Sequence, residues 1–200
     1  MLADRGCEQD GLAWPLGDGG CELPSGLPTE SQANVKQVIA RTAAALGITV
    51  GAFGCEIALR GEEPCLIGVA AGLSGAFATR LIPLCTGVDV VGAAIRAALG
   101  ETVPADEFEV RKSVPVVRLC AHLPSDLKYV AEFEDARKVP GVQQLSVVSG
   151  SRKAAYRNGR IGGTAAVVAT APSREAARNA ARSALSLLPT QSAEPARSQA

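Results

Sequence analysis

Residues 51–101 read GAFGCEIALRGEEPCLIGVAAGLSGAFATRLIPLCTGVDVVGAAIRAALGE, and this stretch decides the fold. Two short apolar runs, Ala52–Leu59 and Cys65–Ala70, flank the polar residues Arg60–Glu63. Two apolar runs joined by a short polar segment with a glycine are typical of a β-hairpin. We therefore expect two antiparallel strands here.

A single carboxylate, Glu56, interrupts the first apolar run. If the turn centres near Glu62, Glu56 faces Gly68 across the strand pair. Facing positions on one side of an antiparallel pair are close enough for two side chains to share a ligand. Here one of the two positions has no side chain.

The order of residues in and beyond the hairpin resembles the C-terminal half of the ATP-grasp carboxylate–amine ligases. About residues 29–188 take part in this resemblance. It implies an α+β fold, with helices packed on an antiparallel or mixed sheet. The positions that carry it in residues 51–101 are Glu56, Leu66, Ile67, Val69, Gly75, Thr86–Val91 and Ala98–Glu101.

The resemblance also implies where the ligands of a ligase would stand. In that family two acidic residues and an asparagine hold the magnesium ions that bridge the ATP phosphates, and an arginine contacts the phosphates. These four positions fall on Glu56, Gly68, Ala70 and Gly72. Magnesium requires oxygen ligands, and only Glu56 offers one. We expect no metal site, no cofactor and no ligase activity from this chain alone.

The composition is that of a globular protein, with 47% hydrophobic and 20% charged residues. Aromatic residues make up only 4%, so small side chains must fill the core. The formal net charge is zero, which gives no basis for electrostatic capture of nucleic acid or an anionic membrane. We see no secretory signal at the N-terminus, and the longest uncharged run, Pro64–Thr79, is short for a membrane span. These features predict a cytoplasmic protein.

Six cysteines and one histidine, His122, are present. No two cysteines have the C-x-x-C spacing that zinc sites favour. Buried, unbonded cysteines are the expected outcome. Cys55 and Cys65 are candidates to face each other across the hairpin, although a reducing cytoplasm disfavours a disulfide there.

The chain divides by composition into four segments. Residues 1–28 are predicted to be irregular, residues 29–102 to form the remnant of the large ATP-grasp subdomain, residues 103–188 to form a small α+β subdomain, and residues 189–200 to form a polar tail. Besides the hairpin we expect helices over 29–46, 76–85, 89–99, 134–138 and 173–188, and strands over 114–121, 127–133, 143–149 and 163–170.

Local signals predict where several helices begin and which face they bury. Thr29 or Ser31, Asp89 and Ser173 are candidate N-caps, because their side-chain oxygens can accept from free amides of a first turn. Two stripes at helical spacing predict buried faces. They are Val35, Val38, Ile39 and Thr42 in the first helix, and Ala176, Ala180, Ala184 and Leu187 in the last.

Candidate functional residues are few. Glu56 and His122 are the candidate catalytic residues; the alternatives are a solvated or ion-paired acid and a structural histidine. Gly72, Ser74 and Gly75 form a loop whose amides could hold an anion, or that simply connects two elements. Arg80 could bind a carboxylate or phosphate, or lie on a solvated helix face.

Three functions remain open at this point. The chain is a non-ligase module that binds a small ligand, such as a carboxylate or a peptide-like molecule, or a partner, either a second copy or a complete ligase. Alternatively, it is an enzyme of natural-product biosynthesis that acts without ATP on an amino-acid-derived substrate. The third reading is a subunit of a split ATP-dependent ligase.

Overall fold

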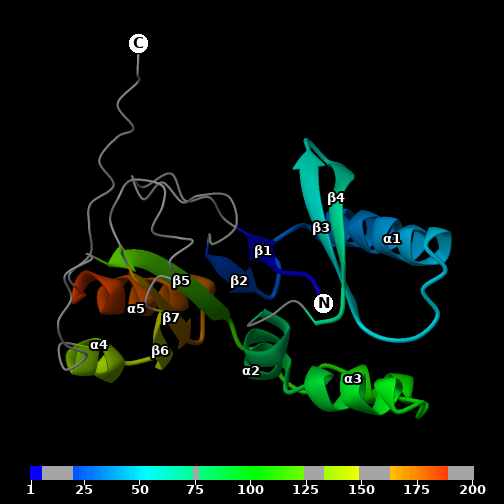
Figure 1. Ribbon diagram of the computed structural model, residues 1–200. Coiled ribbons are helices and arrows are strands. Elements are labelled where there is room, and N and C mark those ends of the chain that lie inside the picture. The colour runs from blue at the N-terminus through cyan, green and yellow to red at the C-terminus, as the bar shows by residue number, and fades with distance from the viewer. Residues whose placement is uncertain (6–19, 74–76, 124–132, 149–162, 189–200) are drawn as a thin grey trace. The chain divides into compact units, whose positions relative to one another are not determined.

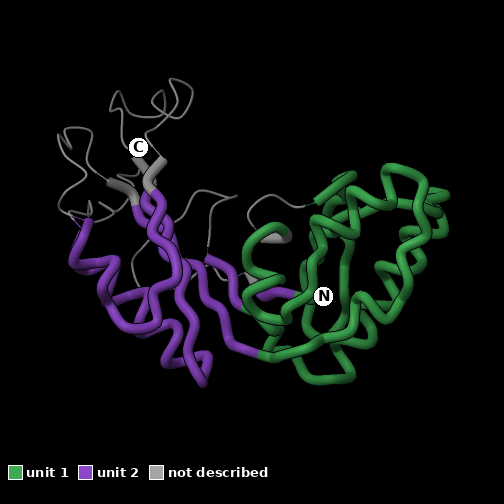
Figure 2. Tube along the Cα trace, turned by 90° about the horizontal axis from the view of Figure 1, so that it is seen from below, with its two compact units in different colours: residues 1–2, 23–113 green, residues 3–22, 114–200 purple. Residues whose placement is uncertain are grey.

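The computed structural model describes residues 1–5, 20–73, 77–123, 133–148 and 163–188. The chain divides into two compact units (Figure 2), of which unit 1 comprises residues 1–2 and 23–113 and unit 2 comprises residues 3–22 and 114–200. The division after Ser113 falls later than the boundary expected between residues 102 and 103. Residues 103–113 belong to unit 1, where η2 (Ala105–Phe108) is tied to the helix that contains Arg96 by an ion pair between Arg96 and Glu107.

Unit 1 begins with a long helix and a hairpin (Figure 1). Helix α1 spans Thr29–Ala45, and the chain then forms β3 (Phe53–Arg60) and β4 (Glu63–Ala71), which pair antiparallel. Helix α1 contacts β4. A two-residue turn at Gly61–Glu62 joins the strands, as predicted for this polar segment.

Three short helical segments follow the hairpin in unit 1. They are η1 (Phe77–Leu81), α2 (Ile82–Thr86) and α3 (Val90–Ala98). The Asp89 side chain accepts from the Gly92 amide and caps α3, which confirms that predicted N-cap. Helix α1 differs, because its N-cap is Pro28 and no side chain caps it. Thr29 instead begins the first turn, so the cap predicted there is wrong.

Unit 2 is built on a sheet in the order β1-β2-β5-β7-β6 (Figure 1). Strand β7 (Gly163–Thr170) lies between β5 (Val116–Leu123) and β6 (Val142–Val148) and pairs antiparallel with both. The short helix α4 (Glu134–Lys138) forms as predicted. The strand predicted over residues 127–133 lies almost wholly outside the described residues.

Helix α5 (Arg174–Ser186) packs against β5 and β7, and Ser173 caps it as predicted by accepting from the Ala176 amide. Small residues dominate this core, as the composition predicted. The buried stripe of α5 is Ala177, Ala181, Ala184 and Leu185. The predicted stripe was therefore mostly one position out of phase, and its last member, Leu187, is 51% exposed. One residue corresponds to about 100° around a helix.

The N-terminal segment contains two short strands where the sequence predicted no regular structure. Strand β1 (Asp4–Arg5) pairs antiparallel with β2 (Cys21–Leu23), and both belong to the sheet of unit 2. Strands this short carry no readable alternation, so local sequence could not reveal them.

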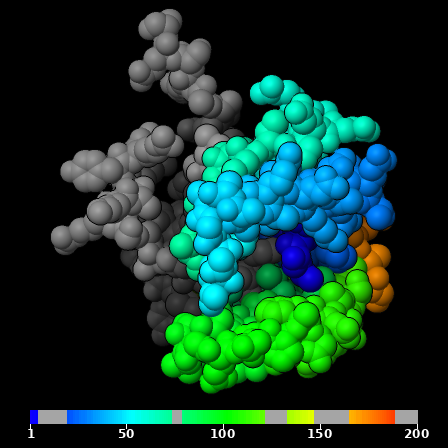
Figure 3. Space-filling model, turned by 90° about the vertical axis from the view of Figure 1, so that its right-hand side faces the viewer, coloured from blue at the N-terminus to red at the C-terminus, as the bar shows by residue number. Residues whose placement is uncertain are grey.

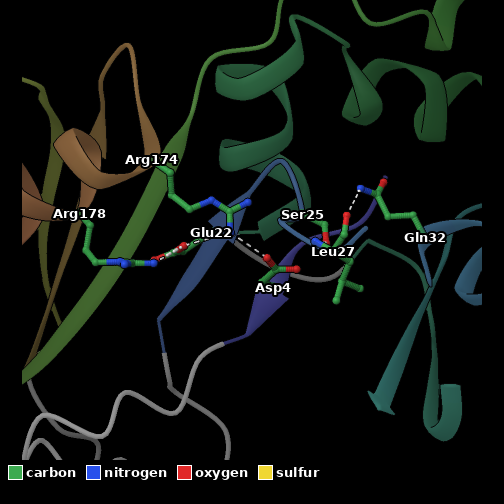
Figure 4. Close-up of polar contacts among 7 residues, drawn as sticks. All are labelled: Asp4, Glu22, Ser25, Leu27, Gln32, Arg174 and Arg178. Atoms are coloured by element: carbon green, nitrogen blue, oxygen red, sulfur yellow. Dashed lines mark hydrogen bonds and ion pairs between the residues drawn. The ribbon is translucent and has the colours of Figure 1, made fainter. Parts of the chain in front are cut away.

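Ion pairs fix these strands to α5 (Figure 4). Arg178 donates to both carboxylate oxygens of Glu22 at 2.8 Å, and Arg174 donates to Asp4 at 3.0 Å. The Glu22 side chain is only 13% exposed. A two-point arginine–carboxylate contact is stronger and more directional than a single surface ion pair.

Candidate functional site

The hairpin of unit 1 places Glu56 directly opposite Gly68. Next to the turn, Arg60 pairs with Glu63. If this register continued unchanged along the strands, Glu56 would lie opposite Ile67. It shifts between Glu56 and Ile57, because Ile67 is an extra residue in β4. This β-bulge produces the predicted pairing. Glu56 is exposed.

At the two remaining positions where the family resemblance implies ligands, Ala70 and Gly72 have no side chain that could bind magnesium or phosphate. Ala70 faces Gly54, so this residue pair carries only a methyl group and a hydrogen. Gly72 follows β4 with φ of 91°, a backbone conformation that favours glycine. Its amide donates to the Ala52 carbonyl at 2.8 Å. An arginine at this position would therefore strain the backbone as it stands.

There is open space at Gly68 in β4 and at Gly72 directly after it. No heavy atom lies within 4 Å of the position that a Cβ would take at Gly68 or at Gly72. Packing therefore does not require glycine at Gly68, where φ is also ordinary. The position opposite Glu56 therefore carries no side chain, although there is room for one.

A groove of about 1080 Å³ lies between α1 and the hairpin. Its lining is mainly apolar, with Val38, Leu46, Phe53, Leu66 and Val69 among its residues. Because side chains alternate along a strand, Phe53 and Glu56 point to opposite faces of β3. The groove and Glu56 thus belong to different faces of the hairpin. Figure 3 shows the tip of the hairpin projecting beyond α1.

Arg41 is the one charged residue of the groove lining. It is exposed, and the described part of the chain supplies no carboxylate within ion-pair distance of it. Arg41 was not among the site residues predicted from sequence. The signal was present, since Val38, Arg41, Thr42 and Ala45 have the 3–4 residue spacing of one helix face.

The two hairpin cysteines do not face each other. Cys55 pairs with Val69 and Cys65 with Ala58, and neither forms a disulfide. The predicted pairing is wrong because the two residues lie on opposite faces of the hairpin. Burial raises the pKa of the Cys55 thiol above its ordinary value. The thiol therefore stays protonated near neutral pH, which makes Cys55 a poor nucleophile.

The other predicted site residues are only partly described. Arg80 lies in η1 and is exposed. Ser74 and Gly75 lie outside the described residues, and the Gly72 amide is already engaged with Ala52. An anion site in this loop stays a prediction.

His122 belongs to β5, opposite Thr164 of β7. It is therefore in unit 2, whereas Glu56 is in unit 1. A joint catalytic role for these two residues stays a prediction. Within the described ranges, no three His, Cys, Asp or Glu residues are grouped so that they could hold a metal ion. Nor does any described helix have the length and apolarity needed to cross a membrane.

Comparison with known proteins places this architecture in a class. No protein-family model matches the chain. A search of solved structures matches L-amino acid ligase from Bacillus licheniformis with a TM-score of 0.72 and 19% identity, over 95% of this chain and 49% of that one. It also matches glycinamide-RNase-transformylase T from Mycobacterium tuberculosis, with a TM-score of 0.57 and 26% identity, over 88% and 43%.

These neighbours are ATP-grasp ligases, and the chain has the fold of about half of such an enzyme. The predicted resemblance and the α+β fold class are thereby confirmed. Among curated proteins, the chain is 30% identical over 159 residues to the uncharacterized protein y4rH of Sinorhizobium fredii. That match covers 78% of this chain and 32% of y4rH, so the chain spans about a third of this relative.

Proposed function

We propose that this chain is an ATP-grasp-type module that is not a ligase by itself and that binds a partner chain or a small ligand. The observation that carries the proposal is the pairing of Glu56 with Gly68. A magnesium-bound nucleotide needs oxygen ligands from the protein. The hairpin offers one carboxylate where the family resemblance implies two acids and an asparagine.

The groove beside α1 supports the binding part of the proposal. Ligand sites are commonly concave, mainly apolar, and equipped with a few polar groups that fix orientation. Here the charged group is Arg41, which would meet a carboxylate. The ligand class is then an apolar carboxylate or a peptide-like molecule. Replacing Arg41 with Gln should weaken binding of such a ligand, whereas the exposed Arg137→Gln on α4 should not.

A second candidate is a subunit of a split ligase, in which another chain supplies the remaining half. The coverage of the solved ligases favours it, because 95% of this chain matches only 49% of the L-amino acid ligase. Co-expression with a candidate second half, followed by affinity purification, separates the two proposals. A stable complex that consumes ATP supports the split ligase, and a complex without ATP consumption supports the non-ligase module.

The proposal is tested on the purified chain by measuring ATP consumption in the presence of magnesium, a panel of amino acids and a panel of carboxylates. We expect no consumption above that of a heat-denatured sample. Turnover that disappears in Glu56→Gln would show that the single carboxylate suffices and would overturn the proposal.

A further inference from the structure

In the part of the chain that the structure describes, the outer edge of β3 pairs with no other strand. Within the described residues the hairpin is a separate two-stranded sheet, so β3 pairs with β4 on one side and with no strand on the other. Such a sheet is only marginally stable by itself in water. An open edge presents unpaired backbone donors and acceptors that a further strand can satisfy.

The two edges of the hairpin differ in how they are protected. Strand β4 contains Pro64 and the bulge at Ile67, and both features disturb regular pairing along its edge. Strand β3 reads FGCEIALR, with no proline, no lysine and no extra residue. The open edge that can accept a strand is therefore the edge of β3.

The charges on β3 are arranged to match a second copy of the same strand. Glu56 and Arg60 are exposed and four residues apart, so they point to one face with Ala58 midway between them. When two such strands pair antiparallel about Ala58, each Glu56 faces the Arg60 of the other copy. On the opposite face, each Ile57 meets the other Leu59. Directly opposite charges of unlike sign stabilise a strand pair, and like charges destabilise it.

The surroundings of Arg60 also favour pairing with a second copy. It is exposed at the end of β3, and the described part of the chain provides no carboxylate within ion-pair distance of it. Leu59 beside it is 39% exposed. A second copy would satisfy the charge, cover the leucine and fill the open backbone edge in one contact.

We infer that two copies of this chain associate through their β3 edges, antiparallel and centred on Ala58, to form a continuous four-stranded sheet. The interface is isologous, since the same residues are contributed by both copies. An edge-to-edge contact is small, so the dimer forms and dissociates with protein concentration. The inference adds a named partner to the proposed function, but it can fail without affecting the nucleotide measurements that test that function.

Charge reversal tests the register. The variants Glu56→Arg and Arg60→Glu each place like charges opposite one another, so each alone should be monomeric by sedimentation velocity at concentrations where the wild type is dimeric. An equimolar mixture of the two variants should recover the dimer. In the mixed dimer the two arginines of one copy each face a glutamate of the other copy. The double variant, with both residues exchanged, should also be dimeric. Circular dichroism confirms that each variant is folded.

A cross-link tests the centre of the pairing independently. Opposite Cα atoms in an antiparallel pair are about 4.5–5.5 Å apart, within the range that a disulfide bridges. Ala58→Cys should therefore give a disulfide-linked dimer on mild oxidation. The control Ala98→Cys, at an exposed position of α3, should give no more dimer than the wild type.

Three results of these experiments would each overturn the inference. They are a wild-type chain that is monomeric at every concentration, single charge variants that dimerise as well as the wild type, and Ala58→Cys that cross-links no faster than Ala98→Cys. A complex formed only with a different polypeptide would also overturn it, since a second copy would then not be the partner.

Discussion

Glu56 in β3 and Gly68 in β4 lie opposite each other because Ile67 is an extra residue in the second strand. The bulge moves the glycine, rather than the isoleucine, into the position across from the carboxylate. Opposite side chains at such a position are near enough to share a ligand. The backbone therefore holds two positions close enough to share a ligand, and Glu56 carries a carboxylate at one of them, whereas Gly68 has no side chain at the other.

Placing a carboxylate at position 68 should create a divalent-cation site. In Gly68→Glu the new side chain has open space and an ordinary backbone conformation. We expect Mn²⁺ to bind this variant about tenfold more tightly than the wild type, a difference of about 1.4 kcal/mol, as measured by electron paramagnetic resonance. Gly68→Gln is the matched control without the charge. Equal affinities of the Glu and Gln variants would show that the two positions do not share a cation.

Gly68 in β4 and Gly72 directly after β4 should respond oppositely to the same substitution. A Cβ meets no atom at either position, so only the backbone conformation differs. Gly68→Ala should raise the free energy of unfolding by about 0.5–1 kcal/mol. Gly72→Ala, at φ of 91°, should lower it by about 1–2 kcal/mol. Urea denaturation measures both, and a stabilising Gly72→Ala would contradict the observed loop conformation.

The phase of α5 can be tested with two neighbouring alanines. Ala177 is fully buried, whereas Ala176 is exposed. Overpacking should make Ala177→Leu destabilising by about 1–3 kcal/mol, and Ala176→Leu should change stability by no more than about 0.5 kcal/mol. Thermal unfolding of the two variants measures the difference. A larger loss of stability in Ala176→Leu than in Ala177→Leu would instead support the buried stripe predicted from sequence.

The contact between Arg178 and Glu22 should stabilise unit 2 more than an ordinary surface pair. Its carboxylate is 13% exposed, whereas the Arg137–Glu134 pair of α4 has side chains 43% and 60% exposed. We expect Arg178→Ala to cost about 1.5–3 kcal/mol and Arg137→Ala to cost at most about 1 kcal/mol. If the two costs are equal, the N-terminal strands are held by something other than this pair.

The pair between Arg96 and Glu107 should make part of the stability depend on pH. The hydrogen bond from Arg96 lowers the pKa of the Glu107 carboxyl below its ordinary value. A carboxylate with a lowered pKa stabilises the folded state above its unfolded pKa, and this stabilisation is lost as the pH falls through the folded pKa. The stability difference between wild type and Glu107→Gln should therefore shrink on acidification. A difference that is constant with pH would contradict the pairing.

Local chemistry predicted some elements well and long-range contacts decided the others. Asp89 and Ser173 could be assigned as caps because a cap involves only residues of the first turn. Strands β1 and β2 could not be predicted, since they are held by contacts such as Arg178–Glu22, which are 156 residues apart in sequence. The pairing of Glu56 with Gly68 was predicted correctly although the turn lies half a residue earlier than assumed. The bulge at Ile67, which sequence did not reveal, compensates for that difference.

The groove was missed for a related reason. Its lining combines α1 with both strands of the hairpin, and sequence periodicity gives the buried face of each element without saying what lies between two of them. Arg41 is informative only when the absence of a carboxylate near it in the described chain is known. The catalytic and anion-binding roles of His122, Ser74 and Gly75 stay predictions.

The most direct test of the central claim is a calorimetric titration of the purified chain with ATP and magnesium. We expect no binding in the micromolar range, because Glu56 is the one of the four implied ligand positions that carries an oxygen ligand for the magnesium–nucleotide complex. Micromolar binding that is lost in Glu56→Gln would contradict the account.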